Sequence, residues 1–179
     1  MASRGADSAV GSASGAGALT AAKALALLIP AGLLAGAYGS QYLGGLAPCE
    51  MCYWQRWAHW AALALAAGAF LLSALPDRGR SFVWLAALAI LVSGGIGLYH
   101  AGVEAGIFQG ATQCTTAAAG GSAEELLGSI MAKPMIRCDE IQFQFLGISM
   151  AGWNAIISIA GALLVLWLSL KRPRSPALA

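Results

Sequence analysis

Two cysteines, Cys49 and Cys52, stand two residues apart in the stretch "APCEMCYWQRWAHW". The first cysteine follows a proline, and the second leads into a segment that we expect to be helical. A helix N-terminus stabilises a thiolate, and the two-residue spacing lets the pair close a small disulfide that reopens easily. The sequence therefore predicts a redox-active pair of thiols.

An arginine and a histidine follow the two cysteines at helical spacing. Cys49, Cys52, Arg56 and His59 are spaced i, i+3, i+7 and i+10, which puts all four on one helix face. A thiol, a cation and an imidazole would then face the same way. Two interpretations of Arg56 stay open: it binds an anion or a polarised carbonyl group, or it extends to the lipid headgroups and does nothing more.

Other uses of cysteine and histidine compete with this interpretation. A zinc site would more naturally show two Cys-x-x-Cys motifs, whereas Cys114 and Cys138 lie far apart in the chain, so no metal is expected. Covalently bound c-type haem needs a histidine directly after the second cysteine, where this chain has Tyr53. A b-type haem held by His59 and His100 stays open, as do hydrogen bonds from these histidines to neighbouring helices.

The elements that must position these residues follow from the composition. Of the 179 residues, 59% are hydrophobic and 10% are charged, which is too little charge to cover a water-soluble domain of this size. Four uncharged stretches could each supply the roughly 20 apolar residues that cross a membrane; they are 24–49, 57–76, 81–103 and 141–170. Their apolar residues are continuous rather than alternating, which favours helices over a barrel. The sequence predicts an all-α membrane protein, a four-transmembrane-helix bundle over residues 21–172.

The basic residues predict the orientation of this bundle. The net charge of +2 is too small to suggest nucleic acid as a partner, but most of the 10 basic residues cluster in three segments. They are Arg4, Lys23, Arg78, Arg80, Lys171, Arg172 and Arg174. By the positive-inside rule these segments are cytoplasmic, and the loops at about 44–55 and 102–144 face outward. Residues 1–20 are then a disordered cytoplasmic leader, and residues 173–179 form a cytoplasmic tail.

The first apolar stretch has a second interpretation. Residues 35–37 read "AGA", which resembles the cleavage site of a signal peptide. The uncharged run continues past this point to a length that is more typical of a membrane span. A span is therefore favoured over a cleaved leader.

The connecting segments carry further signals. The sequence "PDRGRS" at 76–81 predicts a tight cytoplasmic turn. In the long outward loop, Ser122 and Glu125 form a capping box before an apolar run, so a short helix over 122–131 should lie on the membrane surface. Glycines within two of the predicted spans would allow helices to approach closely. They are Gly32, Gly36, Gly94, Gly95 and Gly97.

All four cysteines fall in or beside the two outward segments. They are Cys49, Cys52, Cys114 and Cys138. In an oxidising compartment this distribution predicts disulfides. From the residues alone, these could be redox-active bonds or two inert structural bridges.

Several of these features occur together in one known family. The chain has "PCEMCYWQRW" before the second predicted helix, "YHAGVEAG" after the third and "FLGISMAGWN" at the start of the fourth. With two later cysteines in the second outward loop, it resembles the bacterial inner-membrane disulfide-bond formation protein DsbB over about residues 20–172. The order of the cysteines and the Cys-x-x-Cys-x-x-x-Arg spacing make the resemblance specific.

The resemblance implies an enzyme, a thiol:quinone oxidoreductase. Such a protein reoxidises a periplasmic thioredoxin-like thiol oxidase of the DsbA type and passes the electrons to ubiquinone or menaquinone in the bilayer. Cys114 matches the cysteine that forms the mixed disulfide with the partner, and Cys138 matches its loop mate. Cys49 and Cys52 match the pair that then receives the electrons, with Cys52 facing the quinone.

Two further site residues are implied by the same resemblance. Arg56 matches the arginine of the quinone site, and His100 lies near a family histidine close to that site. The alternative is a membrane protein without enzymatic activity, either a haem-binding electron carrier or a helical protein stapled by disulfides. A Soret band would favour haem, and disulfides inert to a reduced thioredoxin-like partner would favour the structural role.

Overall fold

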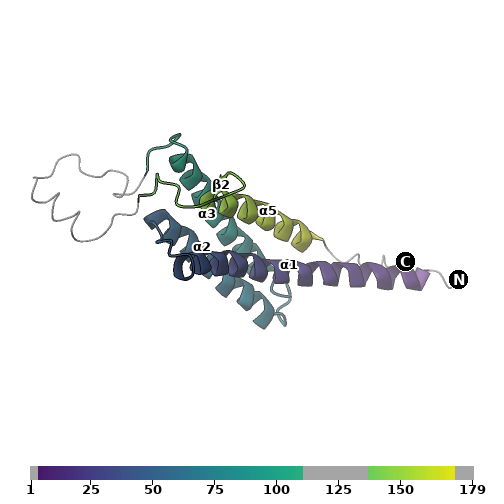
Figure 1. The fold of residues 1–179 in the computed structure, drawn as a ribbon. Coiled ribbons are helices and arrows are strands. Elements are labelled where there is room, and N and C mark those ends of the chain that lie inside the picture. Colours follow the sequence, from purple (N-terminus) through teal and green to yellow (C-terminus); the bar gives the residue numbers. More distant parts are fainter. Residues whose placement is uncertain (1–3, 111–136, 172–179) are drawn as a thin grey trace, which may run out of the picture.

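A computed structural model of the chain describes residues 4–110 and 137–171. Its elements are α1 (Arg4–Tyr42), α2 (Glu50–Leu71), α3 (Arg80–Glu104), β1 (Gln144–Phe145), β2 (Ile148–Ser149) and α5 (Met150–Leu170). The helices run alongside one another as a bundle, and α1 extends beyond the others at its N-terminal end (Figure 1). The start of α1 and the end of α5 point to one end of the bundle, and the β1–β2 hairpin lies at the other.

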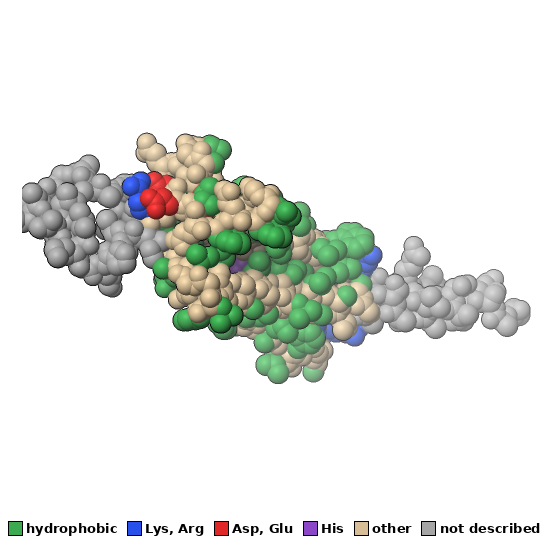
Figure 2. All heavy atoms as spheres, viewed as in Figure 1, with side chains coloured by type: hydrophobic (Ala, Val, Ile, Leu, Met, Phe, Trp, Pro, Cys, Tyr) green, Lys and Arg blue, Asp and Glu red, His purple; other side chains and the backbone are tan. Residues whose placement is uncertain are grey.

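Three helices of the described chain are long and apolar enough to cross a membrane, namely Gly17–Tyr42, Arg80–Glu104 and Met150–Leu170. Helix α2 is not among them. Its first half carries Gln55, Arg56 and His59, which are buried against neighbouring helices instead of facing outward. The prediction of membrane-spanning helices is confirmed for three segments, and the chain is an integral membrane protein. Figure 2 shows hydrophobic side chains over the middle of the bundle, with charged side chains toward its two ends.

Helix α1 begins at Arg4. Residues 1–20 were predicted to be a disordered leader, but the helix already begins within them. The physical reason is that this region is rich in alanine, the strongest helix former, and contains no proline before Pro30. The helix ends at Tyr42, and Gly45, with a φ of 67°, redirects the chain toward α2.

The interior of the bundle away from the hairpin is packed mainly with alanine, together with a few larger apolar side chains. The fully buried residues include Ala22, Ala26, Ala62, Ala66, Ala69, Ala86, Ala87 and Ala162. Small residues let helix backbones approach closely, which drives association within a membrane. Helices α2 and α3 and helices α3 and α5 form the most extensive contacts.

The predicted glycine contacts are confirmed at two positions in α3. A Cβ at Gly94 would lie 2.9 Å from Ile159 Cγ1, and a Cβ at Gly97 would lie 2.9 Å from Asn154 Nδ2. Both glycines therefore allow α3 to approach α5. The same prediction is wrong at the other three glycines, because no atom lies within 4 Å of a Cβ built there. These are Gly32, Gly36 and Gly95.

The predicted turn at 76–81 connects α2 to α3. The Asp77 carboxylate accepts hydrogen bonds from the backbone N–H groups of Gly79, at 3.0 Å, and Ser81, at 2.9 Å, and from the Ser81 hydroxyl. The Ser81 hydroxyl and these N–H groups lower the pKa of Asp77 to about 2. Gly79 has a φ of 76° and lies against the Ala69 carbonyl, so this position requires glycine.

A short antiparallel hairpin precedes α5, which the all-α prediction missed. Leu146 and Gly147 connect the two strands with φ angles of 54° and 76°, as in the two-residue turns that suit hairpins. Ser149 ends the second strand and caps α5, since its hydroxyl accepts from the Gly152 N–H at 3.1 Å. The predicted surface helix at 122–131 and Cys114 both lie outside the described residues.

Candidate functional site

The first cysteine of the motif caps helix α2. Cys49 has an extended backbone, with φ −77° and ψ 173°, and its Sγ accepts from the Cys52 N–H at 3.3 Å. The cap places both sulfur atoms at the positive end of the helix dipole, where negative charge is stabilised. Cys49 is 4% exposed, whereas Cys52 is half-buried.

The two thiols share a hydrogen bond. Their Sγ atoms lie 2.7 Å apart, and neither is in a disulfide. The hydrogen bond to Cys52, together with burial, raises the pKa of the Cys49 thiol. Either sulfur can be the donor in this hydrogen bond, so the two thiols act as a coupled pair.

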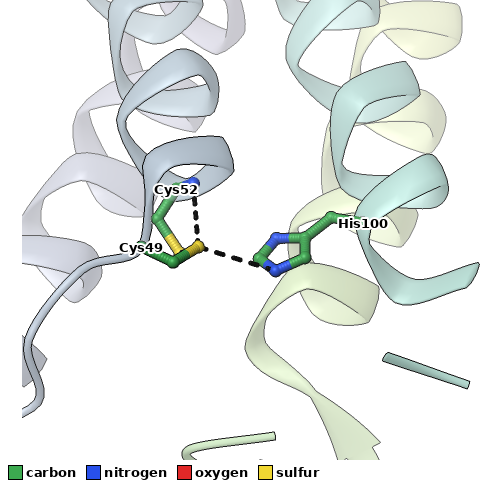
Figure 3. Close-up of side chains that lie close together, drawn as sticks. All are labelled: Cys49, Cys52 and His100. Atoms are coloured by element: carbon green, nitrogen blue, oxygen red, sulfur yellow. Dashed lines mark hydrogen bonds between the residues drawn. The ribbon is translucent and has the colours of Figure 1, made fainter. Parts of the chain in front are cut away.

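His100 of α3 points toward this pair (Figure 3). Its Nε2 lies 3.6 Å from Cys49 Sγ and 3.8 Å from Glu104 Oε1. The backbone of Cys138 also interacts with His100, and Cys138 is completely buried in an apolar cluster with Cys49 and Val103. The structure therefore places Cys138 in the same buried cluster as Cys49, the first cysteine of the motif.

Arg56 lies one turn after Cys52 along α2 and is only 6% exposed. Its Nη1 donates to Gln41 Oε1 at 2.5 Å, and its Nη2 donates to the Ala37 carbonyl at 3.0 Å. The guanidinium also lies over the rings of Tyr38 and Tyr53, with Cζ 4.8 and 5.6 Å from their centroids. Arg56 is thus held inside the bundle against α1, not extended to the headgroups. Neutral acceptors on α1 compensate part of its charge.

A chain of buried hydrogen bonds fixes the orientation of the polar groups below the thiols. Gln55 Nε2 donates to the Met51 carbonyl at 3.2 Å, so Gln55 Oε1 is the acceptor for Asn154 Nδ2, at 2.7 Å. Asn154 Oδ1 must then accept from His59 Nε2, at 2.9 Å. The network therefore assigns the proton of the neutral His59 ring to Nε2 and leaves a lone pair on Nδ1.

The same amide orients the second histidine. Gln55 Nε2 lies 3.0 Å from His100 Nδ1, so it donates to that nitrogen, and the His100 proton is on Nε2, facing Cys49. Cys49, Cys52 and His100 are close enough to hold a metal ion. A protonated Nε2 has no lone pair for a metal, so this orientation disfavours the zinc alternative. The two histidines proposed as haem ligands are instead linked through Asn154 and Gln55.

These side chains border a cavity of about 240 Å³ that is lined by residues of α1, α2, α3, α5 and the segment before the hairpin. Its polar lining comes from Cys49, Cys52, Gln55, Arg56, His59, His100 and Asn154, among others. The rest is largely apolar and includes Leu33, Leu34, Phe143, Phe145 and Trp153. Figure 2 shows a histidine in a recess between hydrophobic side chains. An apolar cavity with a few convergent polar groups is typical of a small-molecule site.

Sequence reasoning named some of the polar residues that line this cavity. They are Cys49, Cys52, Arg56 and His59, which were predicted to share one helix face, and His100 of α3. The supporting residues were missed. They are Gln55, Ser93 and Asn154, and each is a polar residue in an apolar helix, which is the signal that could have found them.

Comparisons with known proteins identify the family of the chain. The family model described as disulfide bond formation protein DsbB matches residues 20–168. The chain is 29% identical over 156 residues to disulfide bond formation protein B of Marinobacter nauticus, which covers 83% of this chain and 90% of that protein. It is 30% identical over 152 residues to disulfide bond formation protein B of Aromatoleum aromaticum, and the match covers 79% of this chain and 87% of that protein. No solved structure gives a significant match. The chain belongs to the DsbB family of disulfide bond formation proteins.

Proposed function

We propose that this protein is a thiol:quinone oxidoreductase. It reoxidises a periplasmic thioredoxin-like dithiol oxidase and passes the electrons through its two cysteine pairs to a membrane quinone. The observation that carries the proposal is that the thiols of Cys49 and Cys52 and the guanidinium of Arg56 border one apolar cavity within the bundle. Membership of a disulfide-forming family supports the thiol chemistry.

The packing of Cys138 and Cys49 in one buried cluster supports the order of exchange. When the Cys49–Cys52 pair is oxidised, a Cys138 thiolate can attack Cys49 Sγ, form a Cys49–Cys138 disulfide and release Cys52 as a thiolate. The helix N-terminus stabilises that leaving thiolate. Cys114, outside the described residues, would then be the cysteine that exchanges with the partner.

The lining of the cavity fits a quinone headgroup. A quinone supplies the sink for the two electrons and two protons that leave a dithiol. Cys52 lines the cavity and would react there as its thiolate, and Arg56 can donate from N–H groups that Gln41 and Ala37 do not use. A guanidinium beside developing negative charge lowers its cost in an apolar environment. The glycines of α1 at the cavity wall leave space there.

The proposed topology has four spans, with both termini cytoplasmic and the cysteines periplasmic in the bacterial inner membrane. Helix α2 would be the fourth span, because it packs beside α1 and α3 and buries its polar side chains within the bundle. A membrane-impermeant thiol reagent applied to reduced intact cells should label the accessible cysteines from outside. Labelling that requires rupture of the inner membrane would contradict this topology.

Turnover of a quinone tests the proposal. Purified protein in detergent, supplied with a reduced periplasmic dithiol oxidase and a short-chain ubiquinone, should convert the quinone to quinol as the partner is oxidised. The same assay with a short-chain menaquinone identifies the preferred acceptor. If the partner stays reduced, or is oxidised without loss of quinone, the proposed function is wrong.

A trapping experiment tests the order of exchange separately. Replacing Cys138 with serine removes the thiol that competes for Cys114, so a mixed disulfide between Cys114 and the partner should persist. The complex can be resolved by non-reducing electrophoresis, with Cys114→Ser as the control that should abolish it. A complex that forms through Cys49 instead would overturn the proposed order.

A further inference from the structure

Glu104, the last residue of α3, places a carboxylate at the cavity. Its side chain is 9% exposed and lines the cavity. Its Oε2 accepts a hydrogen bond from the hydroxyl of Ser149, the residue that caps α5, and its Oε1 lies 3.8 Å from His100 Nε2. Neither the exchange of disulfides nor the contact of Arg56 with a quinone uses this group. Glu104 is therefore an acidic side chain at the cavity without a role so far.

The surroundings of Glu104 suit a group that changes its charge. In the part of the chain that the structure describes, no lysine or arginine forms an ion pair with it. The neutral hydroxyl of Ser149 and the N-terminal end of α5 compensate only part of the charge of a carboxylate. An ionised carboxylate costs free energy in an apolar cavity unless it is fully paired, and a proton removes that charge. Glu104 is therefore able to take up a proton here.

His100 connects the carboxylate to the thiols. Its Nε2 lies 3.6 Å from Cys49 Sγ and 3.8 Å from Glu104 Oε1, and Figure 3 shows the ring pointing toward the sulfur atoms. The sulfur and the carboxylate thus compete for one N–H group. Negative charge on Glu104 also repels a thiolate on Cys52. A proton on the carboxylate removes both effects, so proton uptake by Glu104 and thiolate formation in the pair favour each other.

We propose that Glu104 accepts the proton that leaves the thiol pair when the pair reduces a quinone. The inference rests on the proposed function and adds an acid–base group to it. Closing the Cys49–Cys52 bond releases two electrons and two protons, and both electrons and both protons end on the two oxygen atoms of the quinone ring. Glu104 takes one of these protons as the first thiolate forms, passes it on directly or through one water, and ends as a carboxylate again.

The pH dependence of the reaction should show this step. An ordinary glutamate titrates near about pH 4.3 and an ordinary thiol near about pH 8.5. Between these titrations a carboxylate can take the proton of a thiol, so the wild-type rate should be nearly constant there. Other titratable groups share the cavity or pack beside it, and α1, α5 and the hairpin contribute none to its described lining. They are Cys49, Cys52, Arg56, His59, His100, Arg137, Cys138 and Glu140.

Single-turnover quinone reduction tests the role of Glu104. The full-length protein is reduced, freed of reductant and mixed with short-chain ubiquinone by stopped flow at a series of pH values. Glu104→Gln keeps an acceptor for Ser149 but cannot take up a proton, so the rate should fall about a hundredfold near pH 7. The deficit should shrink about tenfold per pH unit and disappear once the thiols ionise without help. A purely structural role would instead give the same deficit at every pH.

Glu140→Gln provides the matched control. The Glu140 side chain is 69% exposed, and its carboxylate lies 3.7 Å from Arg137 Nε. The substitution removes the same charge from the same end of the bundle, but not beside His100. Its rate should stay within about twofold of the wild type at every pH, because exposed ion pairs contribute little. An equal, pH-dependent deficit in both variants would mean that lost charge, and not proton uptake by Glu104, explains the effect.

A second substitution keeps the inference testable if Glu104→Gln does not fold. Glu104→Asp retains a carboxylate that is one methylene shorter, so its rate near pH 7 should fall less than about tenfold and stay nearly independent of pH there. A wild-type rate that rises steadily with pH through neutrality would overturn the inference, as would a Glu104→Gln profile identical to that of the wild type. If the wild-type protein reduces no quinone at any pH, the proposed function fails as well.

Discussion

The two ends of the same bundle have different interiors. At the end near the turn between α2 and α3, the buried side chains are mostly alanines, such as Ala66 and Ala86, that bring the helices close together. At the end near the hairpin, the interior contains Gln55, His59 and Asn154 around a cavity. Helix α2 contributes to both. One end of the bundle is therefore tightly packed, whereas the other end contains a cavity and buried polar side chains.

The polar end remains compatible with a membrane because its groups satisfy one another. Apart from His59 Nδ1, the side-chain atoms of the described Gln55, His59 and Asn154 have partners in the network. Unpaired polar groups would cost several kcal/mol each in an apolar environment. The alanine end needs no such network, so substitutions at the two ends should fail in different ways.

The largest effect is expected at the thiol that faces the cavity. Cys52→Ala should lower quinone reduction on the order of a thousandfold or more, because the nucleophile is gone. Thermal unfolding of the detergent-solubilised protein should stay close to that of the wild type, since Cys52 is only half-buried. Stopped-flow measurement of quinone absorbance checks the first outcome. Retained quinone reduction would remove Cys52 from the proposed mechanism.

The next effect is expected at Arg56. Replacing it with alanine removes a charge-assisted hydrogen bond worth roughly 1.5 to 3 kcal/mol, so kcat/KM for quinone should fall about tenfold to a hundredfold. Arg56→Lys should recover only part of this, because the planar fork that reaches Gln41 and Ala37 is lost. Exchange of Cys114 with the partner should be unaffected. Wild-type quinone kinetics in Arg56→Ala would mean that the arginine only joins α2 to α1.

At the alanine end, the effect should be on stability alone. Ala66 is fully buried, and its neighbour Ala67 is exposed on the same helix. Ala66→Leu should destabilise the bundle by about 1 to 3 kcal/mol through overpacking, whereas Ala67→Leu should change stability by less than about 0.5 kcal/mol. Thermal unfolding in detergent measures both. A loss of quinone affinity in Ala66→Leu without a loss of stability would show that the two ends are not separate.

The smallest effect is expected at the turn. Asp77→Ala removes the acceptor for Gly79 and Ser81 but leaves quinone reduction unchanged. Because folding lowers the pKa of Asp77 from 3.8 to about 2, its contribution is present above about pH 3.8 and is lost as the pH falls through about 2. The thermal midpoints of wild type and variant should therefore differ at pH 6 and converge in acid. A constant difference down to pH 2 would contradict this role.

Much of the fold could be predicted because a membrane-spanning helix appears in the sequence as a long uncharged, apolar stretch. The uncharged stretch at 81–103 nearly coincides with α3, and the stretch at 141–170 contains α5. Two features were not readable. The hairpin depends on positive φ angles at Leu146 and Gly147, and the extension of α1 to Arg4 lies in a region whose small polar residues suggested disorder.

The site was readable in part for a different reason. Helical spacing put Cys52, Arg56 and His59 on one face, and that face does line the cavity. Spacing along α2 could not reveal partners on other helices, such as Asn154 for His59 or the Ala37 carbonyl for Arg56. Those contacts depend on how the helices pack, which a single sequence does not specify. The roles of the cysteines, Arg56 and His100 in catalysis stay predictions.

The central claim is that the thiol pair meets a quinone at the cavity, and a single-turnover measurement tests it most directly. A Cys114→Ser/Cys138→Ser variant retains only the pair at Cys49 and Cys52. This variant is reduced, freed of reductant without oxygen and mixed with short-chain ubiquinone while the ultraviolet absorbance is followed. The account predicts one quinol per chain and concurrent loss of both thiols, with no partner protein present. Unchanged quinone beside a pair that stays reduced would contradict it.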